Sequence, residues 1–142
     1  MSQQPYLIET ELASDDVVLS PLLPSHRDAL LSAEADGNLS ELWYTSVPNA
    51  GNIDAYLDNA LLQKQQGVAL PFVVLDKHSN KLIGATRFCN ADVVNKRLEI
   101  GYTWYAKSYQ RSAVNTQCKL LLLGYAFEQL DSIAVEFRTH WH

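Results

Sequence analysis

The polar segment that joins a strand-like run to a long apolar helix is the part of this sequence best suited to binding a charged ligand. The run Leu98–Trp104 leads through the loop Ser108–Asn115 into a helix expected over Thr116–Leu130. At the start of a helix the first backbone N–H groups lack helical acceptors, and the positive end of the helix dipole faces outward. Both features favour a phosphate group, so the sequence predicts a phosphate site at this loop.

Individual residues in this region also have purely structural interpretations. Asn115 is equally suited to cap the following helix, and Arg111 can be an ordinary solvated charge. Gly101, within the strand, can mark a bulge or a crowded packing point instead of a close approach to a ligand. The combination of strand, loop and helix therefore carries the prediction, and no single residue carries it alone.

Histidine and cysteine residues do not suggest a second reactive site. His140 and His142 would share one face of a strand, but two ligands are too few for a closed zinc site. Cys89 falls on an expected strand, and Cys118 lies in an apolar helical stripe typical of packing. Because no secretory segment precedes them, we expect two reduced thiols, and we predict neither a metal site nor a disulfide.

Length and composition indicate the class of protein. The chain has 142 residues, of which 47% are hydrophobic and 19% are charged, and its formal net charge is −5. These values fit one globular domain, residues 1–142, with a sizeable core. The negative charge argues against general nucleic-acid binding, which needs clustered Lys and Arg. No run has the character of a membrane span or a signal peptide, so we expect a cytoplasmic location and no membrane partner.

Hydrophobic periodicity and turn residues predict an α+β fold. Apolar residues at helical spacing indicate helices over Arg27–Ala35, after an N-cap at Ser25, from Ile53 to the stop at Gly67, and over Thr116–Leu130, which is apolar nearly all round and should be deeply packed. Five β-rich runs accompany them: Val17–Leu23, Leu70–Asp76, Lys81–Asn90, Arg97–Trp104 and Ile133–Trp141. Short polar turns favour an antiparallel meander for the middle three, and the helical crossover makes the last two parallel.

Four phrases of the sequence, in this order of elements, resemble the GCN5-related N-acetyltransferases (GNAT), and among them the branch of RimJ/RimL type. The phrases are Leu70-Pro71-Phe72-Val73-Val74, Leu82-Ile83-Gly84-Ala85-Thr86-Arg87-Phe88, Leu98-Glu99-Ile100-Gly101-Tyr102 and Asn115-Thr116-Gln117-Cys118-Lys119. The resemblance extends over most of the chain, from Val17 to His142. It implies a GNAT-like acyl-CoA N-acyltransferase fold, mostly antiparallel, with a parallel β-α-β unit at the coenzyme site.

The resemblance also implies acetyl-CoA as the co-substrate. In the family, the fourth and fifth strands splay apart, and the pantetheine arm bonds the fourth strand as an added strand would. Here the arm would pair with the backbone of Ile100, Gly101, Tyr102, Thr103 and Trp104. The pyrophosphate would rest on Gln110, Arg111, Ser112, Ala113, Val114, Asn115 and Thr116. Ala113 and Asn115 occupy the family's glycine positions, and the methyl group of Ala113 would crowd a phosphate or resist a positive φ.

Acetylation of an amine needs a base that accepts a proton from the ammonium and an acid that protonates the departing thiolate. Glu99 is the predicted base, because strand alternation turns it away from its apolar neighbours and a carboxyl group beside a water-poor cleft has a raised pKa. It can instead be an exposed strand glutamate paired with Arg97 or Lys96. The nearby phenols are Tyr102, Tyr105 and Tyr109, and the sequence assigns the acid role to none of them.

Relative to the family, the sequence stops before a last helix, whose tyrosine often serves as the acid, and before two further strands. The last strand would then have an open hydrogen-bonding edge, with Phe137 and Trp141 partly uncovered. We therefore expect self-association into a homo-oligomer, most simply a dimer.

The sequence is compatible with two functions. The first is an N-acetyltransferase that transfers an acetyl group from acetyl-CoA to an amine, either a protein N-terminus or a small molecule. The second is a truncated, catalytically impaired relative that acts as a CoA-binding or protein-interaction module, which the altered glycine positions favour. The acceptor is not identified, because Trp43 and Tyr44 fit an acceptor pocket no better than they fit ordinary packing.

Overall fold

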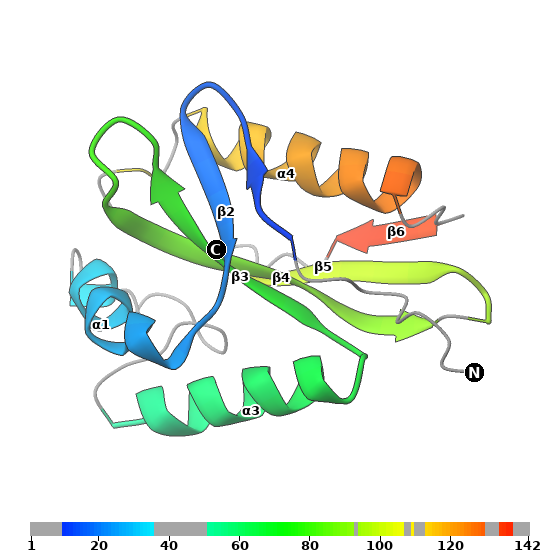
Figure 1. Ribbon diagram of the computed structural model, residues 1–142, viewed down its shortest axis with the longest axis horizontal. Helices are drawn as coiled ribbons and strands as arrows, with labels where there is room; N and C mark the ends of the chain where they lie inside the picture. Colours follow the sequence, from blue (N-terminus) through cyan, green and yellow to red (C-terminus); the bar gives the residue numbers. More distant parts are fainter. Residues whose placement is uncertain are drawn as a thin grey trace.

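A six-stranded sheet lies between helices on its two faces (Figure 1). Helices α1 (Arg27–Ala35) and α3 (Ile53–Gln65) cover one face, and α4 (Val114–Gly124) covers the other. Tyr102, Gln129 and 134–137 are described by their backbone only. The computed structural model describes residues 10–35, 51–92, 94–106, 109, 113–129 and 134–137.

Strand order in the sheet follows the sequence. The strands are β1 (Leu12–Ala13), β2 (Val17–Pro21), β3 (Leu70–Asp76), β4 (Leu82–Asp92), β5 (Arg97–Tyr105) and β6 (Ala134–Phe137). Neighbours from β1 to β5 are antiparallel, and β5 pairs with β6 in parallel. The predicted meander and the parallel β-α-β unit are both confirmed. The short strand β1 is an addition that the sequence pattern does not predict.

The helices differ from expectation mainly at their ends. Ser25 lies inside the 3₁₀ turn η1 (Pro24–His26), so its predicted role as an N-cap is wrong. The imidazole of His26 accepts the Leu23 N–H there, at 3.0 Å from Nδ1. Helix α4 begins at Val114 rather than Thr116, and it continues into the π-helical turn η3 (Tyr125–Gln129). After α3, Gly67 has φ +79°, which is the conformation that makes it the predicted stop.

Two hydrophobic clusters fill the spaces on either side of the sheet. Cys118 and Leu122 of α4 pack against the strands on one face. Leu30 of α1 and Leu57 of α3 pack on the other face, together with the fully buried Trp104 of β5. The alternation of side chains along each strand supplies both clusters, so every central strand is held from two sides.

The expectation that α4 is deeply packed all round is wrong. Its stripe through Cys118 and Leu122 is buried, but Leu120 is 64% exposed and Phe127, in η3, is 47% exposed. A helix that rests on one face of a sheet buries only the side that meets the strands. The second apolar stripe of α4 therefore faces outward.

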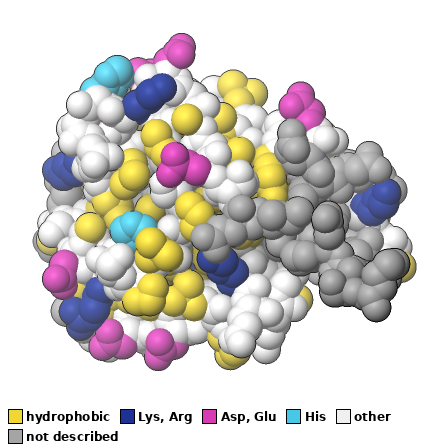
Figure 2. All heavy atoms as spheres, in the orientation of Figure 1, with side chains coloured by type: hydrophobic (Ala, Val, Ile, Leu, Met, Phe, Trp, Pro, Cys, Tyr) yellow, Lys and Arg dark blue, Asp and Glu magenta, His cyan; other side chains and the backbone are white. Residues whose placement is uncertain are grey.

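The surface carries charges of both signs. On the face shown in Figure 2, acidic and basic side chains are interspersed among hydrophobic ones, and neither sign forms a continuous patch. Among the helices that the structure describes, none combines the length and the apolar character needed to cross a membrane.

Candidate active site

Strand β5 contains a bulge at the position where the sequence predicts the coenzyme. Ala85 of β4 pairs with Trp104, and Arg87 pairs with Gly101. Two steps along β4 therefore correspond to three steps along β5, so β5 carries an extra residue between Gly101 and Trp104. Bulges bend a strand and re-aim its backbone groups, which turns this part of β5 away from a regular ladder.

Within the described residues, the parallel pairing of β5 with β6 extends as far as the residue before that bulge. The last described pair joins Ile100 to Phe137. We call Arg97–Ile100 the paired half of β5 and Gly101–Tyr105 its open half, because the described part of β6 lies beside the first and not the second. An unpaired strand edge presents a row of backbone donors and acceptors, to which an extended ligand can bond as an additional strand.

The start of α4 lies beyond the open half and is tied to it. Tyr105, the last residue of β5, donates its hydroxyl to Asn115 Oδ1 at 2.9 Å. Ala113 stands at the N-cap position and has no side-chain cap, so the proposed capping role of Asn115 is wrong. The first helical bond runs from Gln117 N–H to the Ala113 carbonyl, at 3.0 Å. Amide groups ahead of Gln117 therefore have no acceptor within the helix.

Ala113 fits the backbone at this position without strain. Its φ is −68°, in the ordinary helical region, and its side chain is exposed. A glycine is needed only where φ is positive or where a Cβ would collide with a neighbour. The concern that Ala113 would have to adopt a positive φ is therefore removed.

Tyr105 of β5 and Cys118 of α4 are buried in the same hydrophobic cluster, where the helix packs on the sheet. Burial raises the pKa of the Cys118 thiol to about 11, although the hydrogen bond with Tyr105 acts in the opposite direction. Burial also raises the pKa of the Tyr105 hydroxyl above its ordinary value, as does the neighbouring Cys118. Cys118 and Cys89 are both free and buried. Cys118 is thus a packing residue and is poorly suited to act as a nucleophile.

Glu99 lies on the paired half of β5, half-buried, opposite Cys89 on β4 and at the same register as Glu136 on β6. Its Oε2 accepts a hydrogen bond from Asn90 Nδ2, at 2.5 Å. Asn90 has φ 49°, in the left-handed region that asparagine tolerates better than most residues. Asn90 is a partner that the sequence does not reveal.

Two further polar residues adjoin the bulge. Thr86 and Thr103 share a hydrogen bond between their hydroxyls, at 2.7 Å. Arg87, only 2% exposed, pairs with Gly101, and its guanidinium carbon lies 5.4 Å from the centre of the Tyr56 ring. That distance is typical of a cation–π contact. The sequence does not reveal either feature. The two threonines are far apart along the chain, and an arginine in a strand resembles an ordinary surface residue.

The structure describes some of the predicted binding residues and not others. Ile100 and Trp104 are buried, and Trp104 has an indole N–H without a hydrogen-bond partner among the described residues. Gly101 and Thr103 lie at the bulge, where Tyr102 is described by its backbone only. The first turn of α4 contains Val114, Asn115 and Thr116. Outside the described residues lie Gln110, Arg111, Ser112, Trp43, Tyr44, Trp141, His140 and His142.

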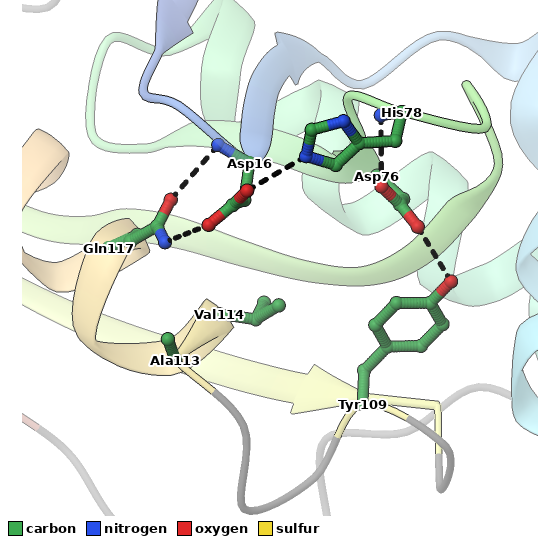
Figure 3. A pocket seen from close by; sticks show the side chains of 7 residues that line it. All are labelled: Asp16, Asp76, His78, Tyr109, Ala113, Val114 and Gln117. Atoms are coloured by element: carbon green, nitrogen blue, oxygen red, sulfur yellow. Dashed lines mark hydrogen bonds and ion pairs between the residues drawn. The ribbon is translucent and has the colours of Figure 1, made fainter.

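A hollow of about 280 Å³ opens beside the start of α4 (Figure 3). Its walls come from the β1–β2 turn, the end of β3 with the turn that follows, and α4. The lining residues are Asp16, Asp76, His78, Tyr109, Ala113, Val114 and Gln117. The sequence gives no sign of this hollow, since its polar members are far apart along the chain.

Comparisons with known proteins agree with this geometry. A family model described as "Acetyltransferase (GNAT) domain" matches residues 16–142. The chain therefore belongs to the GNAT acetyltransferase family, and its fold is the GNAT fold. No match was found among curated protein sequences.

Solved structures with the same fold include proteins that bind coenzyme A. A GCN5-related N-acetyltransferase from Brucella melitensis gives a TM-score of 0.77 at 26% identity, covering 90% of this chain and 59% of that one. RimL, a ribosomal L7/L12 alpha-N-protein acetyltransferase in complex with coenzyme A, gives 0.66 at 20% identity, covering 82% and 67%. A microcin C7 self-immunity acetyltransferase in complex with acetyl-CoA and AMP gives 0.69 at 18%, covering 84% and 67%. This chain thus spans less than two thirds of the Brucella protein.

Proposed function

We propose that this chain is an N-acetyltransferase that transfers the acetyl group of acetyl-CoA to an amine. The observation that carries the proposal is the order of three features along β5: the described pairing with β6 reaches Ile100, the bulge follows, and α4 begins beyond it. An open strand edge suits the amide groups of pantetheine, and a helix start suits a pyrophosphate. Membership of the GNAT family supports this assignment.

The described residues fit such a co-substrate. The backbone of Ile100, Gly101, Tyr102, Thr103 and Trp104 would bond the pantetheine arm, and Ala113, Val114, Asn115 and Thr116 would hold the pyrophosphate with Gln110, Arg111 and Ser112. Ala113 is compatible, because its helical φ leaves the backbone donors of the first turn in ordinary geometry. Acetyl-CoA supplies an activated thioester. The protein's task is to bind it, orient it and manage protons.

Glu99 is the proposed base. It would take a proton from the acceptor ammonium at a carboxylate oxygen, directly or through a water molecule. The hydrogen bond from Asn90 fixes the orientation of that carboxylate, so that its second oxygen can face the acceptor. Tyr105 and Tyr109 already donate their hydroxyls to Asn115 and Asp76, which makes both poor candidates for protonating the thiolate.

The acceptor is proposed to be a protein N-terminus or a small amine. The family phrases of RimJ/RimL type and the similarity of fold to RimL support the first of these. We further propose that residues 1–142 form a single domain and act in the cytoplasm.

Self-association is also part of the proposal. The exposed Leu120 and Phe127 lie on the outer side of α4 and η3, and β6 is the last strand of the sheet among the described residues. A second copy would cover both the apolar side chains and the edge. Sedimentation at increasing protein concentration tests this, and a single monomer mass throughout the micromolar range would contradict it.

Calorimetric titration with coenzyme A, followed by an acetyl-transfer assay with an N-terminal peptide and a small amine, tests the function. Binding and turnover are expected. Replacing Arg111 with Ala should weaken binding about 5-fold, because a hydrogen bond to a charged group is lost. Arg97→Ala, at the other end of β5, is the matched control and should leave binding unchanged. Absence of heat with the unmodified chain would refute the proposal.

A further inference from the structure

A continuous hydrogen-bond network lines the hollow beside α4, where Figure 3 shows each link as a dashed line. The network runs, in order, through Gln117, Asp16, His78, Asp76 and Tyr109. All its links are between side chains except one, which is donated by the backbone N–H of His78. We propose that this network is a polar clamp that positions the start of α4 and thereby sets the affinity for the coenzyme, an inference that rests on the proposed function. Its members act through α4 and do not themselves touch the reacting atoms.

At one end of the polar clamp, both the nitrogen and the oxygen of the Gln117 side-chain amide are hydrogen-bonded. Gln117 Nε2 donates to Asp16 Oδ2 at 2.6 Å, and Gln117 Oε1 accepts the Asp16 N–H at 3.2 Å. The hydroxyl of Ser14 also donates to Gln117 Oε1. Gln117 closes the first helical bond of α4 to Ala113, so the β1–β2 turn fixes the rotation of α4 about its axis at this turn.

The other end of the polar clamp holds Tyr109. Its hydroxyl donates to Asp76 Oδ2 at 2.8 Å, and its backbone N–H donates to the Ala106 carbonyl at 2.8 Å. Tyr109 and Gln117 stand on the two sides, along the sequence, of the segment 110–112. The polar clamp therefore connects both Tyr109, which precedes α4, and the first turn of α4 to the same end of strands β2 and β3.

His78 connects the two ends. Its Nε2 bonds Asp16 Oδ1 at 2.8 Å, and its backbone N–H donates to Asp76 Oδ1 at 3.0 Å. The hydrogen bond to Asp16 raises the pKa of His78 above its ordinary value, and Asp16 and Asp76 add to that effect by charge. Desolvation opposes this rise in pKa, as does the charge of Lys77, whose ammonium donates to the Ser14 carbonyl at 3.1 Å. The same bond from His78 is the main reason that the pKa of Asp16 is lowered.

The hydrogen bonds argue for a positioning role over a separate ligand site. The carboxylates of Asp16 and Asp76 already accept donors from the protein at both of their oxygens. Within the residues that the structure describes, no group of three His, Cys, Asp or Glu residues is placed to hold a metal ion. Two carboxylates would also repel a phosphate. The effect of the network must therefore pass through α4, to which it is directly bonded.

Two variants test the clamp without disturbing the core. Tyr109→Phe removes only the hydroxyl that reaches Asp76, and His78→Gln removes the link to Asp16. Tyr109→Phe should raise the Kd for coenzyme A about 5-fold, because it removes a part-buried hydrogen bond. His78→Gln should raise it about twofold, because the bond to Asp16 is exposed. In both variants kcat at saturating acetyl-CoA should stay within about twofold. Asp54→Asn, which breaks the 2.8 Å pair with Arg27 between α1 and α3, is the matched control and should leave Kd unchanged.

A ligand-free measurement accompanies the titration. Amide hydrogen exchange in the first turn of α4 should be faster in Tyr109→Phe and His78→Gln than in the unmodified chain, and unchanged in Asp54→Asn. Raised Kd values with faster exchange would support the polar clamp. Unchanged Kd values in both variants, or a fall in kcat without a change in Kd, would overturn it while leaving the acetyltransferase proposal intact. No binding of coenzyme A by the unmodified chain would overturn both.

Discussion

The two halves of β5 use the same strand for different purposes. The paired half, Arg97–Ile100, has neighbours on both sides and presents Glu99, whose orientation is set by Asn90. Among the described strands, the open half, Gly101–Tyr105, pairs with β4 and not with β6. The difference suggests a division of labour, in which the paired half supplies a chemical side chain and the open half supplies binding. If this division holds, a change in one half should leave the role of the other intact.

The largest effect is expected where β4 supports the open half. A Cβ at Gly84 would lie 2.3 Å from the Trp104 carbonyl oxygen, which is backbone and cannot turn aside. Gly84→Ala should therefore lower the free energy of unfolding by about 3 kcal/mol, as measured by urea denaturation. At Gly124 the same change meets nothing within 4 Å, so Gly124→Ala should be neutral or stabilising by up to about 1 kcal/mol. Equal effects at both sites would show that β4 and β5 do not approach so closely.

The paired half should affect chemistry and not binding. Glu99→Gln keeps the shape and the hydrogen-bond acceptor but removes the base, so kcat should fall about 100-fold while the Kd for coenzyme A is unchanged. Steady-state kinetics and calorimetry measure the two quantities. Glu128→Gln, on the exposed turn η3, is the control for loss of a carboxylate. Unchanged turnover in Glu99→Gln would remove Glu99 from the mechanism.

A smaller loss of turnover is expected from the residue that orients the base. Asn90→Gly removes the amide that donates to Glu99 but keeps a residue that accepts φ 49°. We expect kcat to fall about 10-fold, because the carboxylate loses a hydrogen bond and its fixed orientation. Unfolding free energy should change little. A loss of stability with full activity would instead indicate that Asn90 serves only the fold.

The hydroxyl pair Thr86–Thr103, at the bulge, allows a test of how the open half contributes to stability. Thr103→Val leaves the hydroxyl of Thr86, a residue 2% exposed, without its partner at 2.7 Å. The cost in unfolding free energy should be about 1 to 2 kcal/mol, and part of it should return in the double variant Thr86→Val/Thr103→Val. Additive losses would show that the two hydroxyls do not depend on each other.

The smallest expected effect is a pH dependence of stability, which comes from the bond between His78 and Asp16 in the polar clamp. The pKa of His78 is raised above 6.5, so its bond to Asp16 contributes fully below that pH and fades as the pH rises through the pKa in the folded state. The pKa of Asp16 is lowered from 3.8, so its contribution is present above that value and is lost in acid. The melting temperature should therefore differ most between the unmodified chain and His78→Gln from pH 3.8 to 6.5. A difference that does not shrink toward pH 8 would contradict this.

Periodicity and turn chemistry were sufficient to predict most of the fold. The β-rich runs Leu70–Asp76 and Arg97–Trp104, and the short polar turns between the strands, led to the antiparallel meander. Strand β1 could not be predicted, because two residues contain no period. The exposed side of α4 was missed for a related reason: leucine spacing shows which residues are apolar, but only the sheet decides which of them are covered.

The candidate site was predictable where it depends on the order of elements along the chain. Gly101 and the start of α4 follow from a strand, a loop and a helix in succession. The polar clamp and the pair Asn90–Glu99 were not predictable from the sequence. Asp16, His78 and Gln117 lie in two separate turns and in α4, and they meet only once the helix has packed on the sheet. A bulge likewise leaves no mark on hydrophobic alternation until the partner strand is known.

Both cysteines are buried, Cys89 at 3% exposure and Cys118 at 0%, one on each of two neighbouring layers. A thiol that is sealed in this way reacts with a soluble disulfide reagent only when the surrounding structure opens. The rates at which the two thiols are labelled therefore report how often the sheet, at Cys89, and helix α4, at Cys118, open to solvent. If acetyl-CoA holds that helix in place, adding it should slow the labelling of Cys118 more than that of Cys89.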